Sequence, residues 1–144
     1  MTFQLPDPTT PFGARVARRL REEHLIWMTT VDAKGTPQPN PVWFLWDDAT
    51  STILIYSRPN AKRLEHLRQN PRVALNLDGN GTGGDIIVIT GEARFSPGDP
   101  PANKVPAYIE KYRGYVARLN YDPGEFAAAY PVALRIDPTI IRGH

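Results

Sequence analysis

A short basic segment, residues 57–63, carries the residue types in this chain that are best suited to binding chemistry. It has the sequence Ser-Arg-Pro-Asn-Ala-Lys-Arg, which combines a hydroxyl, an amide and three cations. An apolar strand pattern precedes it and a helical pattern follows it. The first turn of a helix presents free backbone N–H groups and the positive end of the helix dipole, both of which attract anions. The segment is therefore a candidate phosphate site, and the alternative is that Asn60 only caps a helix whose first turn is basic.

The rest of the chain offers few groups for covalent catalysis. It has no cysteine, which excludes thiolate nucleophiles, iron–sulfur clusters and cysteine-bound zinc. The three histidines lie far apart, and no serine has the context of a nucleophile elbow. Lys62 and Arg63 also oppose the helix dipole unless an anion offsets them. This pattern favours a protein that binds a cofactor and leaves the difficult chemistry to it.

A second candidate region spans residues 36–46, in which Pro37, Pro39 and Pro41 alternate. In an extended strand the missing N–H donors of alternate residues fall on one edge, which cannot pair as an ordinary ladder. That edge is predicted to face solvent or something other than a strand. Residues 42–46, Val-Trp-Phe-Leu-Trp, are predicted to continue the strand, buried on both faces. The alternative is that residues 40–44 line a slot for a flat ring.

The scaffold predicted for these regions is mainly β, in one domain over residues 1–144. Fifteen prolines and eleven glycines spread along the chain indicate many turns. We predict a chiefly antiparallel sheet that closes into a small barrel. Its six strands are expected near residues 24–31, 36–46, 52–56, 72–78, 85–95 and 132–136. Helices are expected from Pro11, over residues 64–69, over residues 103–119 and over residues 123–129.

Smaller features refine this scaffold. Residues 79–84 are rich in glycine, but a strand and not a helix follows them, so they are interpreted as a hairpin turn. Gly91 is predicted to mark a bulge or a close approach of two backbones. The arginines of the first helix are interpreted as a solvated face. His66 has no second ligand at metal spacing and is assigned to the surface or to packing, so no metal site is predicted.

Charge and hydropathy limit the expected partners. The formal charge of +2 is small and the cations are interspersed with acids, so nucleic acid is not expected as a partner. No apolar run approaches the roughly 20 residues needed to cross a bilayer, and the first residues lack the pattern of a signal peptide. We therefore expect a cytoplasmic protein that does not bind membranes.

Four segments resemble those of a known family, the flavin- and deazaflavin-binding split β-barrels related to pyridoxamine 5′-phosphate oxidase. They are Leu25–Thr30 with Gly35–Pro39, Pro41–Trp46, Tyr56–Lys62 with Leu67, and Asn70–Leu75. The chain is most similar to the branch that uses the deazaflavin F420 in place of FMN. The resemblance implies an α+β, mainly β fold, namely a six-stranded antiparallel split β-barrel of the FMN-binding type with peripheral helices.

The resemblance also implies roles for particular residues. The phosphate region of the cofactor would be bound by Ser57, Arg58, Asn60, Lys62 and Arg63. The cofactor ring and its side chain would lie along Gln38, Asn40, Pro41, Val42, Trp43 and Phe44. Many relatives have Asn-Leu where this chain has His66-Leu67, which separates it from the common pattern. Members are homodimers with the cofactor in a groove between subunits, so the aromatic strand and the third helix are expected to serve the interface.

These implications give one hypothesis and two alternatives. The hypothesis is an oxidoreductase that transfers a hydride between bound F420 and an unsaturated or quinone-like small molecule. The alternatives are an FMN-dependent oxidase or reductase of the same fold, and a non-catalytic protein that binds a flavin, a deazaflavin or haem. F420 ends in an acidic tail, for which Arg15, Arg18 and Arg19 are candidate partners. No catalytic residue is singled out among the candidate proton donors, which are Tyr56, Tyr112, Tyr115 and Tyr130.

Overall fold

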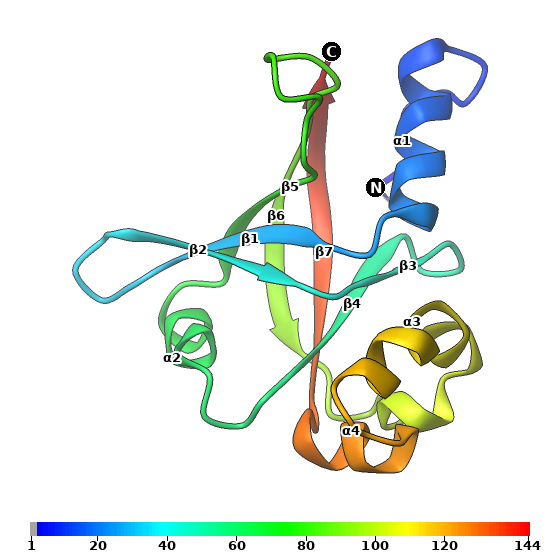
Figure 1. Ribbon diagram of the computed structural model, residues 1–144. Coiled ribbons are helices and arrows are strands. Elements are labelled where there is room, and N and C mark those ends of the chain that lie inside the picture. The colour runs from blue at the N-terminus through cyan, green and yellow to red at the C-terminus, as the bar shows by residue number, and fades with distance from the viewer. Residues whose placement is uncertain (1–2) are drawn as a thin grey trace.

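A computed structural model describes residues 3–144 as a curled sheet with helices around it (Figure 1). Residues 1 and 2, at the start of the predicted domain, lie outside the described residues. The helices are α1 (Pro11–Glu22), α2 (Lys62–Gln69), the short 3-10 helix η1 (Ala102–Lys104), α3 (Pro106–Arg118) and α4 (Pro123–Ala129). The strands are β1 (Ile26–Val31), β2 (Pro37–Val42), β3 (Leu45–Asp47), β4 (Thr52–Ser57), β5 (Arg72–Asn76), β6 (Ile87–Phe95) and β7 (Val132–Gly143).

The strands form one antiparallel sheet in the order β2-β1-β5-β6-β7-β4-β3. The two edge strands, β2 and β3, are consecutive in the chain, so the sheet must curl to bring its edges near each other. Figure 1 shows β1 and β2 crossing the long strands β6 and β7 at a steep angle. No ladder joins β2 to β3 within residues 3–144, so the sheet is a half-barrel. The predicted antiparallel split-barrel fold with peripheral helices is confirmed.

The predicted number of strands was wrong, because residues 36–46 form two strands and not one. Trp43 and Phe44 belong to neither strand. The Phe44 N–H donates to the Tyr112 hydroxyl at 2.8 Å, and the Phe44 carbonyl accepts from Lys111 Nζ at 2.7 Å. Side chains of α3 therefore satisfy the backbone groups that a strand ladder would have used. β3 then joins the opposite edge of the sheet, giving seven strands within residues 3–144.

The alternating prolines behave as predicted. β2 is an edge strand, and Gln38, Asn40 and Val42 lie opposite residues of β1 in the ladder. The prolines leave the other edge without donors, and no strand of the described chain pairs there. An edge of this kind resists unwanted pairing with other sheets.

β7 and α3 differ in length from the predictions. β7 continues past Ile136 to Gly143, because Pro138 falls at a register shift beside Gly91, where a ladder bond is already interrupted. A Cβ at Gly91 would collide with the Asp137 carbonyl oxygen, so the predicted bulge and close approach are both confirmed. The third helix begins at Pro106 and not near residue 103, since proline has no N–H to continue the preceding 3-10 turn.

Two apolar clusters hold the fold together. One fills the inside of the curled sheet, where α1 and α2 contribute Leu20, Leu64 and Leu67. The other covers β4 and β7 from outside, where α3 and α4 contribute Tyr108, Tyr112 and Phe126. The predicted capping box at the start of α4 is confirmed. The second cluster forms one wall of the site described next.

The arginine-rich face of α1 is not wholly solvated, and that prediction was wrong for Arg19. Its side chain is only 6% exposed. It donates to the carbonyl oxygens of Asp78 and Asp85 and to the Glu23 carboxylate. A buried guanidinium persists when its donors are matched in this way. Arg19 therefore fastens α1 to the hairpin between β5 and β6.

Candidate functional site

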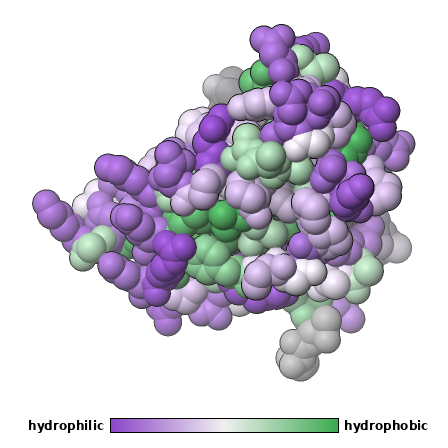
Figure 2. All heavy atoms as spheres, turned by 90° about the horizontal axis from the view of Figure 1, so that it is seen from below, coloured by the Kyte–Doolittle hydropathy of each residue, from purple (hydrophilic) through white to green (hydrophobic). Residues whose placement is uncertain are grey.

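Two cavities adjoin each other beside the basic segment. A polar cavity of about 750 Å³ lies between the β1–β2 hairpin and α2. An aromatic cavity of about 470 Å³ lies between the ends of β2 and β4 and the helices α3 and α4. Ala61 and Arg63 line both cavities. Seen from below, on the side of α2 and α4, apolar side chains gather in one region bordered mainly by hydrophilic ones (Figure 2).

Most of the predicted site residues meet at these cavities. The polar cavity is lined by four of them: Gln38, Asn40, Lys62 and Arg63. The aromatic cavity is lined by Pro41, Val42, Trp43, Arg58 and again Arg63. The folded chain thus brings the basic segment beside β2, although about 20 residues separate the two regions in the sequence.

Three predicted site residues line neither cavity. Phe44 is fully buried and is held by α3, as described above. Ser57 is also fully buried, and its Oγ accepts a hydrogen bond from Arg63 Nη1 at 2.9 Å. Asn60 is exposed at the turn. Phe44 and Ser57 therefore support lining residues instead of facing the cavities.

The start of α2 has no side-chain cap. The N-cap position is Ala61, which cannot accept a hydrogen bond from the first turn through its side chain. Asn60 does not occupy that position, so the alternative in which Asn60 caps the helix is wrong. Lys62 and Arg63 add cations to a turn that is already electropositive. An anion placed there would offset both the dipole and the charges.

Arg63 is the least satisfied of these cations. Burial lowers the pKa of its guanidinium, although an arginine stays charged at any ordinary pH. Its Nε atom is buried and has no hydrogen-bond partner among the described residues. A buried charged donor without a partner costs free energy unless a ligand completes its hydrogen bonds. The position of Arg63 on the wall shared by both cavities makes it the clearest candidate anion contact.

Aromatic rings build the second cavity. Trp43 stacks on Tyr112 with 4.7 Å between ring centroids and on Phe126 with 5.4 Å between centroids. Arg58 lies over the ring of Tyr130, 4.7 Å from its centroid. Flat apolar walls with a few polar groups are typical of sites for planar conjugated molecules.

The tyrosines of this region differ in how their hydroxyls are used. The Tyr56 hydroxyl donates to the Pro100 carbonyl at 2.6 Å, and the Tyr112 hydroxyl bonds to the backbone at Phe44 and His24. Burial raises the pKa of Tyr56 to about 12, so this hydroxyl stays protonated near neutral pH. Tyr108, which the sequence did not single out, lines the aromatic cavity. Its spacing of four residues from Tyr112 on one helix was the available signal.

The polar cavity is rimmed by an ordered hairpin. Asp32 accepts hydrogen bonds from the backbone of Lys34 and Thr36 and from Gln38 Nε2. These bonds, led by the one from Thr36, lower the pKa of the Asp32 carboxyl. His66 is half-buried on the opposite wall, and its Nδ1 lies 2.8 Å from Thr30 Oγ1. The hairpin thus presents Gln38 to the cavity in a fixed position.

The arginines of α1 do not reach this site. Arg15 and Arg19 pair with Asp85, at 2.9 Å and 3.2 Å, in the loop between β5 and β6. Neither of them, nor Arg18, lines the polar or the aromatic cavity. The predicted cationic track from the basic segment to these arginines is therefore not formed by the described chain.

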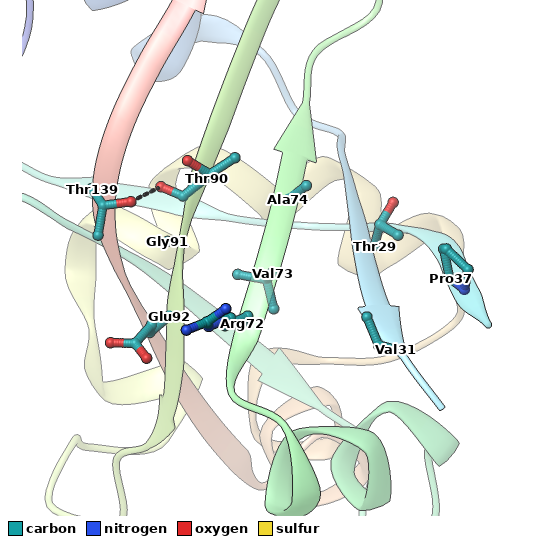
Figure 3. A pocket seen from close by; sticks show the side chains of 10 residues that line it. All are labelled: Thr29, Val31, Pro37, Arg72, Val73, Ala74, Thr90, Gly91, Glu92 and Thr139. Atoms are coloured by element: carbon teal, nitrogen blue, oxygen red, sulfur yellow. Dashed lines mark hydrogen bonds between the residues drawn. The ribbon is translucent and has the colours of Figure 1, made fainter. Parts of the chain in front are cut away.

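A third cavity lies elsewhere, on the face of the sheet formed by β1, β5 and β6 (Figure 3). It measures about 590 Å³ and shares no lining residue with the other two. Small side chains such as Thr29, Ala74 and Thr90 line most of it, with Arg72 and Glu92 at one end.

Neither a metal site nor a membrane-spanning helix is present within residues 3–144. No group of three histidine or carboxylate side chains in this part of the chain is placed to hold a metal ion. None of its helices is both long enough and apolar enough to pass through a membrane.

An antiparallel half-barrel of this strand order with helices around it has the split-barrel fold. The chain belongs to the pyridoxamine 5′-phosphate oxidase family, whose model matches residues 12–144. Many members of this family are oxidoreductases, and the fold is used to bind flavins, deazaflavin or haem. No curated protein matches the chain significantly.

Solved structures share the fold at low sequence identity. A candidate pyridoxamine 5′-phosphate oxidase from Listeria innocua is 20% identical, with 90% of this chain and 94% of that chain covered and a TM-score of 0.67. An F420 reductase is 21% identical, with 87% and 94% covered and a TM-score of 0.66. The haem storage protein HutZ from Vibrio cholerae is 16% identical, with 89% and 92% covered and a TM-score of 0.55. At these identities the likeness defines the fold and not the ligand.

Proposed function

We propose that this protein is an oxidoreductase that binds F420 and transfers a hydride to or from an unsaturated or quinone-like small molecule. The observation that carries the proposal is the position of Arg63. Its guanidinium has a buried Nε with no partner among the described residues and lies on the wall between a polar and an aromatic cavity. A cofactor with a phosphate joined to a flat ring would satisfy this donor and use both cavities at once.

The chain's own residues fit such a cofactor. Lys62 and Arg63 would hold the phosphate, with Ser57 fixing Arg63 from behind and Arg58 and Asn60 adding polar groups at the turn. Gln38 and Asn40 would bind the polar chain of the cofactor from the hairpin side. These residues include both the cations and the hydrogen-bonding amides that such a ligand needs.

The ring would lie along Pro41, Val42 and Trp43 at the aromatic cavity. Phe44 would keep this segment in place through its backbone bonds to Lys111 and Tyr112. The bound deazaflavin supplies the hydride chemistry. The protein binds and orients the ring and limits the access of water to it through the aromatic walls.

F420 is preferred to FMN because of the space beside the phosphate position. The polar cavity is the larger of the two, and Lys34 lines it together with Lys62 and Arg63. FMN ends at its phosphate, whereas F420 continues into a longer acidic tail that would use this volume and these cations. The structural likeness to an F420 reductase agrees with this choice. FMN remains the alternative cofactor at the same residues.

Equilibrium titrations of the purified chain with F420, FMN and haemin test the proposal. We expect F420 to bind at least tenfold more tightly than FMN, with the protein isolated free of bound flavin. Reduced F420 should then be oxidised when 1,4-naphthoquinone is added. Tight FMN retained through purification with no F420 binding would contradict the proposal. Haemin binding without any F420 binding would favour a non-catalytic haem protein.

We also propose that the protein is a cytoplasmic homodimer with the cofactor groove at the interface. The lack of cysteine in the chain supports the compartment. The exposed apolar side chains of Leu25 and Leu119 at the aromatic cavity support pairing there, because a second copy of the chain would cover them. Light scattering should give twice the chain mass. Leu119→Arg should shift the protein to monomer, and a monomeric wild-type protein would contradict the pairing.

A further inference from the structure

One buried hydroxyl at the aromatic cavity has no hydrogen-bond partner in the described part of the chain. Tyr108 lines this cavity and its side chain is fully buried. Its hydroxyl oxygen makes no hydrogen bond within residues 3–144. Buried polar groups are nearly always paired, so an unpaired one calls for a partner that binds from outside the chain.

The neighbouring tyrosines show that this state is specific to Tyr108. Tyr112, one helical turn further along α3, is equally buried, and its hydroxyl accepts from the Phe44 N–H and donates to backbone carbonyl oxygen. Tyr56 contacts Tyr108 edge to face, with 5.1 Å between centroids, and its hydroxyl donates to Pro100. Two of these three rings are therefore fixed by backbone bonds, and the third keeps a free donor.

We propose that the Tyr108 hydroxyl donates a hydrogen bond to a carbonyl oxygen on a flat conjugated ring bound in the aromatic cavity. It would thereby select such ligands over hydrocarbons of the same shape. The inference rests on the proposed function and deepens it, because it names the residue that recognises the ring. The carbonyl can belong to the pyrimidine ring of the cofactor or to a quinone-like substrate, since both present the same acceptor.

The surroundings favour donation by Tyr108. Burial raises the pKa of this hydroxyl well above its ordinary value, so it keeps its proton. Phe126, 6.1 Å away between centroids, and Tyr56, 5.1 Å away edge to face, pack against the ring of Tyr108 and hold it in place. A site built to bond a polar atom discriminates strongly against a ligand that lacks it, because its own group is then left unpaired.

The test compares 1,4-naphthoquinone with naphthalene, which has the same rings and no oxygen. Binding to the cofactor-free full chain is followed by saturation-transfer NMR, and the chain has no cysteine that a quinone would alkylate. We expect the wild-type protein to prefer the quinone, and Tyr108→Phe to lower this preference about five- to tenfold. An unchanged preference, or binding of neither compound, would overturn the proposal.

The melting temperature is a second measurement, because it would fall if the Tyr108 hydroxyl had a structural role within the protein. Tyr108→Phe removes an unpaired hydroxyl, so its melting temperature should equal or exceed that of the wild type. Tyr112→Phe is the matched control on the same helix, and it should lower the melting temperature by several degrees because it breaks the bonds to Phe44. An equal loss in both variants would mean that Tyr108 has a partner within the protein, and would refute the inference.

A competition experiment distinguishes the two sources of the carbonyl. If saturating F420 displaces the quinone, the hydroxyl serves the cofactor ring; if both bind together, it serves the substrate. The Tyr108 comparison itself needs no cofactor. Failure of F420 to bind would therefore reject the proposed function while the quinone preference still stood, and a wild-type protein that binds F420 but does not prefer the quinone would reject only the role of Tyr108.

Discussion

Replacing Arg63 with methionine should separate binding from stability at the proposed phosphate site. Methionine keeps the unbranched apolar stem and removes the guanidinium. The change abolishes the buried Nε, which has no partner among the described residues, and also the 2.9 Å bond from Nη1 to Ser57. The first loss favours the folded state and the second opposes it.

The two effects on stability can be weighed. An unpaired buried donor costs about 1–3 kcal/mol, and a hydrogen bond from a charged group contributes about 1.5–3 kcal/mol. The two effects of Arg63→Met are therefore of similar size, and the net change in the free energy of unfolding lies between a gain of about 1.5 and a loss of about 2 kcal/mol. For a chain of this length each kcal/mol shifts the melting temperature by about 2–4 °C. We expect the variant to melt within several degrees of the wild-type temperature.

Ligand binding, in contrast, should weaken. A hydrogen bond to a charged group contributes about 1.5–3 kcal/mol, so the dissociation constant of F420 should rise about 10- to 150-fold. The deazaflavin riboside FO has the same ring without the phosphate, and its affinity should change less than threefold. Fluorescence titration gives the dissociation constants of F420 and FO for the wild-type protein and for Arg63→Met. The change in the F420-to-FO affinity ratio between the two proteins measures the contribution of the phosphate contact.

Lys62→Met is the matched control for this experiment. Lys62 is exposed and lines only the polar cavity, so its loss should leave the melting temperature nearly unchanged and weaken F420 alone. If Arg63→Met lowered the melting temperature and left the ratio of F420 to FO affinity unchanged, Arg63 would be a structural residue and the phosphate assignment would be refuted.

Three further predictions concern the scaffold. Gly91→Ala should destabilise the fold by about 1–3 kcal/mol in chemical denaturation, because the added methyl group meets the Asp137 carbonyl, and an unchanged midpoint would disprove the clash. Arg135 lowers the pKa of Asp99 to about 2, so stability should fall as the pH drops from about 4 to about 2, and Asp99→Asn should lose less over that interval. Burial lowers the pKa of Lys111 to about 8, so the unfolded chain binds more protons between about pH 8 and pH 10.5. Stability should therefore rise with pH across that range, and Lys111→Met should remove the rise in pH-dependent melting curves.

Local features of the fold followed directly from the sequence. The alternating prolines allowed only an edge strand, because proline lacks the donor that a ladder needs. The glycine-rich turn, the bulge at Gly91 and the capping box of α4 were likewise predicted, since each depends on a few adjacent residues. Residues from both segments predicted to bind the cofactor, 36–46 and 57–63, also line the cavities. These segments could be selected from the sequence because cations at a helix start and prolines in a strand are poorly suited to a purely structural role.

Features that depend on distant partners could not be predicted in this way. The break between β2 and β3 requires Tyr112 and Lys111, which lie more than 65 residues away and bond to the backbone of Phe44. Arg19 was assigned to solvent because its carbonyl partners, Asp78 and Asp85, come from a remote loop. Hydrogen-bond satisfaction over such separations is a property of the folded chain and leaves no local pattern.

The candidate site shows the same division. The sequence by itself determined which residues are cationic, aromatic or unable to pair, and so which segments were suited to bind a cofactor. Only the tertiary structure decided that Arg63 stands between two cavities with an unpaired donor, and that Tyr108 differs from Tyr112 one helical turn away. The reason is that residue type fixes the groups a side chain carries, whereas packing decides which of those groups are left without a partner.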